Sequence, residues 1–133
     1  MFALSNVKGR EMKTILTAAA TILALAAPAL AEGDADKGAK EFRKCKACHK
    51  LEDGANGTGP HLFNVVNRDI GAVDGFGYSG VLAEMGGAWG YEELSGFLAN
   101  PKAYAKGTKM GFSGLKKPAD KANVIGYLQS LGG

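Results

Sequence analysis

The chain has 133 residues, a length that allows one domain, and it contains 20 glycines and 2 cysteines. Hydrophobic residues make up 46% and charged residues 22%, so a disordered tail is excluded, and so few cysteines exclude a miniprotein stapled by disulfides. One long uncharged run excludes a protein with several membrane spans. The formal net charge is +3, but residues 1–31 supply +2 of it (three basic residues less one acidic), so charge gives no support to nucleic-acid binding.

The first 31 residues have the pattern of an export signal. An uncharged run, residues 14–31, follows three basic residues and ends in Ala29-Leu30-Ala31. A basic start, a short apolar middle and small residues before the cleavage point are typical of a secretory signal peptide. Cleavage after Ala31 leaves 133 − 31 = 102 residues, so we expect a domain over residues 32–133 in the periplasm. The alternative is an uncleaved membrane anchor, because the 18 residues of the run are just enough to span a bilayer.

The domain is predicted to be all-α, with helices joined by long glycine-rich loops. Asp34 is placed to cap a first helix, whose apolar face runs from Ala35 to Cys45 at helical spacing. Gly38 lies on this face four residues before Phe42. Its missing side chain leaves room for another helix to cross closely.

The rest of the domain is predicted to alternate loops with two more helices. Residues 51–77 contain six glycines and form a loop, and a loop this long is usually functional or wraps around something. Tyr91–Asn100 is a short helix that ends before a proline, and residues 107–114 are a second loop. The last helix begins at Pro118 and stops at Gly132, and its apolar stripe has three members: Val124, Leu128 and Leu131.

The chemistry of the chain begins in the motif Cys45-Lys46-Ala47-Cys48-His49. Three hypotheses fit two cysteines at this spacing in an exported protein. A disulfide would close a small ring and remove little chain entropy. A thioredoxin-like redox pair starts a helix beside a parallel sheet, whereas this motif comes late in a helix with no strand before it. Covalent heme attachment is the specific meaning of Cys-x-x-Cys-His, because each thiol can add to one heme vinyl group and the histidine then faces the iron. We favour the heme.

An iron held by His49 leaves its opposite face to explain, and three side chains are candidates for a second ligand: Met110, Met85 and His61. Met110 lies in a loop long after the attachment motif, and its neutral thioether is a soft ligand that favours reduced iron. Met85 lies among apolar residues, where a methionine is commonly core packing. His61 is too close in sequence to His49 to reach the far face.

Several segments resemble class I cytochrome c, and the bacterial c2/c550 group in particular. They follow the family's order over nearly the whole domain: Cys45–His49, Gly59-Pro60, Trp89, Asn100-Pro101-Lys102, Gly107-Thr108-Lys109-Met110 and Tyr127-Leu128. The resemblance implies a small all-α cytochrome c fold wrapped around one heme c, attached through Cys45 and Cys48. It also implies that His49 and Met110 are the two metal ligands.

The resemblance further implies cofactor-binding roles for residues away from the motif. Pro60 matches the residue whose carbonyl accepts a hydrogen bond from the ligand histidine and so fixes its ring. The groups around the heme propionates are matched by five residues: Arg68, Tyr78, Ser79, Trp89 and Thr108. For each of them the alternative is plain packing or a solvated charge. Two positions depart from the family, since Phe97 stands where a tyrosine is usual and Leu82 where an asparagine is common.

By this resemblance the chain is a monomeric electron carrier and not an enzyme, since two protein ligands leave no position for a substrate at iron. The expected partners are acidic docking faces of membrane redox complexes: a cytochrome bc1-type donor, and a cytochrome c oxidase or photosynthetic reaction centre as acceptor. Nucleic acid and stable membrane insertion after cleavage are not expected. Lysines expected near the heme edge would steer docking: Lys44, Lys46, Lys50, Lys102, Lys106, Lys109, Lys116 and Lys117. The competing classes are a heme enzyme or sensor with an open iron position, and a thiol–disulfide protein.

Overall fold

The computed structural model describes residues 33–132, and the predicted signal peptide and its membrane-anchor alternative lie outside them. The elements follow in the order α1 (Ala35–Glu41), the 3-10 turn η1 (Phe42–Lys44), α2 (Gly80–Glu84), α3 (Tyr91–Ala99), α4 (Pro101–Tyr104) and α5 (Pro118–Ser130). Over residues 33–132 the β pairing amounts to one isolated bridge, between Asp69 and Ala88. The predicted all-α fold is confirmed. None of the helices in this range is both long and apolar enough to cross a bilayer.

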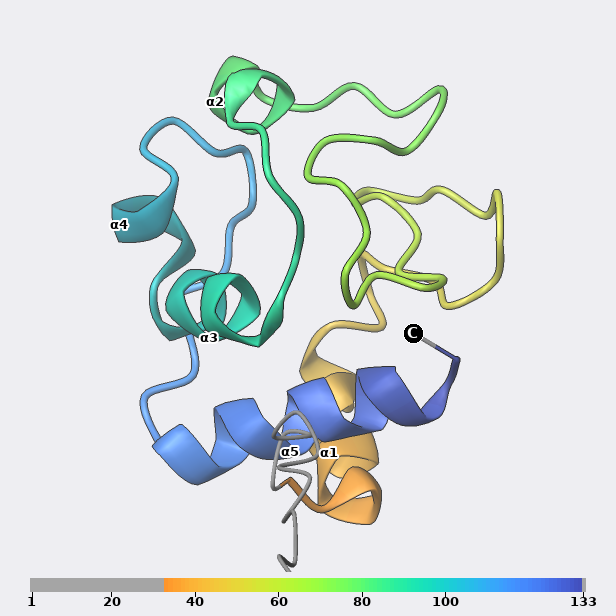
Figure 1. Cartoon of the computed structure of the whole chain (residues 1–133), viewed down its shortest axis with the longest axis vertical. Helices are drawn as coiled ribbons and strands as arrows, with labels where there is room; N and C mark the ends of the chain where they lie inside the picture. Colours follow the sequence, from red (N-terminus) through yellow and green to blue (C-terminus); the bar gives the residue numbers. More distant parts are fainter. Residues whose placement is uncertain (1–32, 133) are drawn as a thin grey trace, which may run out of the picture.

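The helices α1 and α5 cross at one end of the molecule (Figure 1). Asp34 caps α1 as predicted, because one of its carboxylate oxygens accepts hydrogen bonds from the backbone N–H groups of Asp36 and Lys37, at 2.9 and 3.1 Å. A Cβ on Gly38 would overlap the backbone carbonyl of Asn123 in α5, so a glycine is required for this approach. The close crossing that Gly38 predicted is therefore confirmed.

The two sides of the molecule above this crossing differ in structure. The short helices α2, α3 and α4 lie on one side, whereas residues 45–79 form the other side without a helix (Figure 1). Val65 from this loop and Leu94 and Phe97 from α3 belong to one buried cluster, which also includes Phe42 beneath them in η1. The long predicted loop over residues 51–77 is thus confirmed, and it packs against the core of the domain.

Two helix ends differ from the sequence prediction. The first helix does not run as an α-helix to Cys45, because it tightens into η1 and Cys45 follows as the residue that caps that turn. Leu131 lies beyond the last residue of α5 and is 46% exposed, so it does not belong to the buried stripe of Val124 and Leu128. The stop itself is confirmed, since Gly132 has the positive φ of 104° that ends many helices.

Two helices were not predicted. The helices α2 and α4 have 5 and 4 residues, too few to show an apolar period in the sequence. The predicted helix at residues 91–100 ends one residue earlier, at Ala99, because Asn100 caps α4. Its side-chain oxygen accepts a hydrogen bond from the N–H of Ala103 at 3.2 Å. The Asn-Pro pair therefore joins two helices at this point.

Candidate heme site

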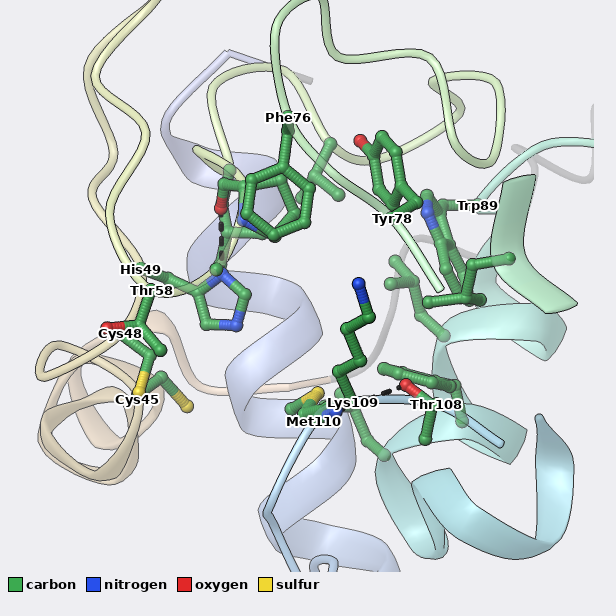
Figure 2. A pocket seen from close by; sticks show the side chains of 18 of the residues that line it. Cys45, Cys48, His49, Thr58, Phe76, Tyr78, Trp89, Thr108, Lys109 and Met110 are labelled. Atoms are coloured by element: carbon green, nitrogen blue, oxygen red, sulfur yellow. Dashed lines mark hydrogen bonds between the residues drawn. The ribbon is translucent and has the colours of Figure 1, made fainter. Parts of the chain in front are cut away.

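One cavity opens between the loop of residues 45–79 and the segment of residues 108–111, with the hydrophobic core behind it. The cavity has a volume of about 290 Å³. Figure 2 shows the two cysteines and His49 on one side of it, with Tyr78 and Trp89 across from them. All the predicted site residues line it: Cys45, Cys48, His49, Pro60, Arg68, Tyr78, Ser79, Trp89, Thr108 and Met110.

Cys45 and Cys48 lie one turn apart at the edge of the cavity. The backbone N–H groups of Cys48 and His49 both donate to the carbonyl of Cys45, at 3.1 and 2.9 Å, and this turn holds the motif together. Both cysteines are free thiols, so the structure does not contain the predicted disulfide alternative. Burial raises the pKa of the Cys45 thiol, and the positive charge of Lys44 opposes the change. Two unlinked thiols at the cavity edge are what attachment of a heme through thioethers requires.

The ring of His49 is held in one orientation. Its Nδ1 lies 2.8 Å from the carbonyl oxygen of Pro60, and because a carbonyl only accepts, Nδ1 carries the proton. Nε2 then keeps a free lone pair, the form in which an imidazole binds a metal ion. Burial is the main cause that lowers the pKa of His49, and the nearby charge of Arg68 lowers it further. The hydrogen bond to Pro60 acts in the opposite direction. The ring is therefore neutral and ready to ligate at neutral pH.

Only one of the three candidates for a second ligand reaches the cavity. Met110 lines it, and its backbone N–H donates to the hydroxyl oxygen of Thr108 at 3.3 Å. Met85 packs against the hydrophobic core and is not part of the lining. His61 also lies outside the lining, with its Nδ1 3.5 Å from Nη1 of Arg68. The geometry therefore favours Met110 as the partner of His49.

Two buried polar atoms at the cavity have no hydrogen-bond partner among residues 33–132. They are Nε of Arg68 and the hydroxyl oxygen of Ser79, and both residues line the cavity. The Nη1 atom of Arg68 does have partners, because it donates to the carbonyls of His61 and Phe63 at 3.0 and 2.9 Å. Burial lowers the pKa of Arg68, but a guanidinium stays charged in proteins. Since an unpartnered buried donor is costly, these atoms indicate an anionic acceptor within the cavity.

Tyr78 and Trp89 lie next to each other in the cavity wall (Figure 2). The hydroxyl oxygen of Tyr78 accepts a hydrogen bond from the N–H of Val73 at 3.1 Å, and its own proton stays free to donate. Trp89 is buried, and its backbone N–H donates to the carbonyl of Arg68 at 2.8 Å. The two segments that carry Arg68 and Trp89 are thus fastened together beside the cavity.

Part of the apolar wall was not predicted from the sequence. Phe76 lines the cavity and packs edge-on against Tyr78, with 4.9 Å between the ring centroids. A large aromatic residue between two glycines was the signal that could have identified it. Phe97 and Leu82, the two departures from the family pattern, both line the cavity as well. Apolar side chains therefore line the cavity at the two positions where the family commonly has polar groups.

The residues of the cavity fit a covalently attached heme. Two thiols, a neutral imidazole and a thioether line a mostly apolar space. The unpartnered donors of Arg68 and Ser79 can bind the acidic side chains of a porphyrin. Among the described residues no group of three or more His, Cys, Asp or Glu side chains could hold a metal ion by itself.

Comparison with known proteins identifies the family. Over 90 residues the chain is 49% identical to cytochrome c2 iso-2 of Magnetospirillum fulvum, and the match covers 68% of this chain and 94% of that protein. The chain belongs to the class I cytochrome c family. The solved structure of cytochrome cH from Methylobacterium extorquens has the same fold, with a TM-score of 0.70 and 41% identity over 74% of this chain and 99% of that one. Class I cytochromes c are electron carriers, and the cofactor of this chain is heme c bound covalently.

Other relatives are longer proteins. The cytochrome c-type cyt cy of Rhodobacter capsulatus is 50% identical over 105 residues, which are 78% of this chain and 52% of that protein. The chain spans about half the length of the curated relatives of this kind, since matches to cytochrome c homologs of Rickettsia typhi and Bradyrhizobium diazoefficiens cover 56% and 53% of them. No protein-family model matches the chain. Membership in class I cytochrome c shows that the thiol–disulfide hypothesis was wrong.

Proposed function

We propose that the chain carries single electrons between membrane redox complexes in the periplasm. Cys45 and Cys48 bind the heme c through thioethers, and His49 and Met110 are the two protein ligands of its iron. One observation carries the proposal: Met110 lines the same cavity as Cys45, Cys48 and His49, although it lies far from their motif in the sequence. With two side chains as ligands, no position remains at the metal for a substrate, so the role is transfer and not catalysis.

The side chains of the cavity suit a centre that changes its charge by one. A bound heme supplies a one-electron couple at iron. The hydrogen bond to Pro60 would hold the ring of His49 in the orientation that ligation requires. The neutral sulfur of Met110 favours the reduced state and raises the potential. The apolar wall that includes Phe76 and Phe97 would also raise the potential, because a site without water disfavours the more charged oxidised state.

The polar residues of the cavity have a separate role in binding. Nε of Arg68 and the hydroxyl of Ser79 would donate to the heme propionates, which satisfies both buried atoms. The free hydroxyl proton of Tyr78 is a further donor at the same wall. These contacts hold the acidic side chains of the porphyrin within the protein and fix the orientation of the cofactor.

The proposed partners are acidic docking faces on a bc1-type donor and on an oxidase or reaction-centre acceptor. Lys109 supports this proposal, since it is exposed and lies at the cavity itself. Lys44 contributes less than the sequence suggested, because its amine forms an ion pair with Glu41 at 2.8 Å. Positive charge around the cavity mouth would speed encounter with an acidic face while keeping the complex weak.

Ligation by Met110 is tested on the oxidised protein at neutral pH. We expect a low-spin spectrum with a far-red band from sulfur-to-iron charge transfer, lost in Met110→Ala together with a fall in potential. Met85→Ala is the matched control, because Met85 lies outside the cavity, and it should keep the band. A high-spin spectrum of the unchanged protein, or ready binding of carbon monoxide after reduction, would instead make the chain a heme enzyme or sensor.

Docking through the cavity mouth is tested by reversing charge at Lys109. Lys109→Glu should slow the reaction with an acidic redox partner by about tenfold at low salt and flatten its dependence on ionic strength. Lys37→Glu on the far helix α1 makes the same change in net charge away from the cavity and should have a small effect. Equal rates for the two variants would show that net charge alone, and not this surface, governs association.

A further inference from the structure

Residues 108–116 form the segment that carries Met110 (the Met110 segment), and this segment passes the end of α3 on the way from α4 to α5 (Figure 1). Thr108 fixes its start, because the N–H of Thr108 donates to the carbonyl of Ala105 at 3.0 Å. Within the described part of the chain, no backbone-to-backbone hydrogen bond reaches residues 109–114. The position of Met110 therefore depends on how firmly the two ends of the segment are held.

The far end of the Met110 segment is packed against the last residues of α3. Leu115 is 5% exposed, and its N–H donates to the carbonyl of Leu98 at 2.7 Å. Gly114, one residue earlier, has a φ of 106° and lies so close to α3 that a Cβ would overlap the carbonyl of Ala99. A glycine adopts this conformation without strain and leaves room for this approach. Gly114 therefore determines where the segment meets the helix.

Lys116 joins the same two parts of the chain through its side chain. Its amine donates to the carbonyl of Ser113 at 3.0 Å and to the carbonyl of Ala99 at 3.4 Å. Ala99 is the last residue of α3, and a basic side chain at this end of a helix satisfies carbonyls that lack partners within the helix. From the sequence, Lys116 was expected to steer docking, whereas in the structure its amine has acceptors within the chain.

We infer that Gly114 and Lys116 are positioning residues that keep Met110 on the metal by holding the end of its segment against α3. This inference rests on the proposed function, because it takes Met110 as the second ligand of the heme iron. Displacing the sulfur requires the Met110 segment to move, and the contacts with Ala99 oppose that movement. A small ligand from solvent binds only after the segment has moved, so its apparent affinity is reduced by the fraction of molecules in which the metal is open. Weakening either contact raises that fraction.

The experiment titrates the oxidised holoprotein with imidazole and follows the loss of the sulfur-to-iron band. Lys116→Met removes the amine but keeps an unbranched side chain, and imidazole should bind about threefold more tightly, the scale of one hydrogen bond from an exposed group. Lys116→Arg restores a donor of similar reach and should return the affinity toward that of the unchanged protein. Lys117→Met is the matched control, since it makes the same change in charge at the neighbouring residue, whose side chain does not cap α5.

A second variant tests the backbone contact. In Gly114→Ala the new methyl group would overlap the carbonyl of Ala99 at a positive φ, and imidazole should bind at least about tenfold more tightly. Gly86→Ala is the matched control, because Gly86 also has a positive φ, of 69°, but nothing lies within 4 Å of its Cβ. The control should lose some stability without a change in its affinity for imidazole.

The result for Lys116 decides the inference even if Gly114→Ala fails to fold, because the Lys116 side chain is exposed. An affinity of Lys116→Met equal to that of Lys117→Met would overturn the inference, and so would a gain that Lys116→Arg does not reverse. In either case a sulfur-to-iron band in the unchanged protein would leave the proposed function standing. An unchanged protein without this band would overturn the proposed function as well.

Discussion

The two ends of this molecule are stabilised in different ways. Where α1 and α5 cross, backbone lies against backbone over Gly38, and Val124 and Ile125 behind it are 2% and 0% exposed. At the other end, loops and residues of α2, α3 and α5 surround a cavity, and two buried polar atoms in its wall lack partners among residues 33–132. The crossing is completed by the chain itself, whereas the cavity end is complete only with its cofactor.

This difference has a physical cause in the size of the domain. A chain of about 100 residues buries a limited part of its surface, and here a mostly apolar cavity opens against its core. The heme supplies the missing partner for that surface and for the buried donors. Stability and cofactor binding are thus coupled on the cavity side, and we expect little such coupling at the helix crossing.

The largest expected effect comes from removing the heme. Cys45→Ala or Cys48→Ala should leave little holoprotein, and the remaining chain should have a markedly lower free energy of unfolding, because it loses a group that contacts only the folded state. Heme content and urea unfolding followed by circular dichroism measure both. Ala47→Ser changes an exposed residue of the same motif and should keep the heme. A colourless variant as stable as the holoprotein would contradict the dependence of the cavity end on its cofactor.

The helix crossing can be tested at Gly38, which is not part of the cavity lining. In Gly38→Ala the new methyl group would overlap the carbonyl of Asn123, so we expect a loss of about 2 kcal/mol in unfolding free energy with an unchanged heme spectrum. Gly80→Ala in α2 is the matched control, because nothing lies within 4 Å of its Cβ, and its stability should rise by about 0.5 kcal/mol. If Gly38→Ala were as stable as the control, the crossing would not be the tight contact that it is taken to be.

A smaller and more local effect is expected where the cavity meets its ligand. A Cβ on Gly59 would overlap the ring of His49 and disturb the hydrogen bond to Pro60, at a cost of about 1 kcal/mol. Gly59→Ala should therefore shift the potential and weaken the axial histidine, seen in the absorption spectrum and in the pH at which the ligand is lost. Gly80→Ala lies outside the cavity lining, with nothing within 4 Å of its Cβ, and should leave both readouts unchanged. Identical behaviour of the two variants would show that His49 is not positioned by this contact.

The sequence predicted best the elements whose signals are local. The cap at Asp34, the start of α5 at Pro118 and the close approach at Gly38 each depend on one or two residues, and the structure confirms them. The helices α2 and α4 were missed because a single turn has no apolar period, and Leu131 was assigned to the stripe although the helix ends before it. Spacing alone could not reveal where a helix tightens, as η1 does before Cys45.

The site was predictable only where a motif carries the chemistry. The spacing of Cys45, Cys48 and His49 predicts a heme. The choice of the second ligand among Met110, Met85 and His61 required the family resemblance or the fold. The structure separates these three by their access to the cavity. No local pattern could reveal that Arg68 contacts His61, because that contact joins two parts of a folded loop.

The most direct test of the account is the mass of the intact protein, purified from a host that matures such proteins and then denatured. The account predicts a polypeptide of residues 32–133 that retains one heme after denaturation, with the added mass located on the peptide that contains Cys45 and Cys48. A polypeptide of unmodified mass, with no chromophore attached to either cysteine, would contradict it.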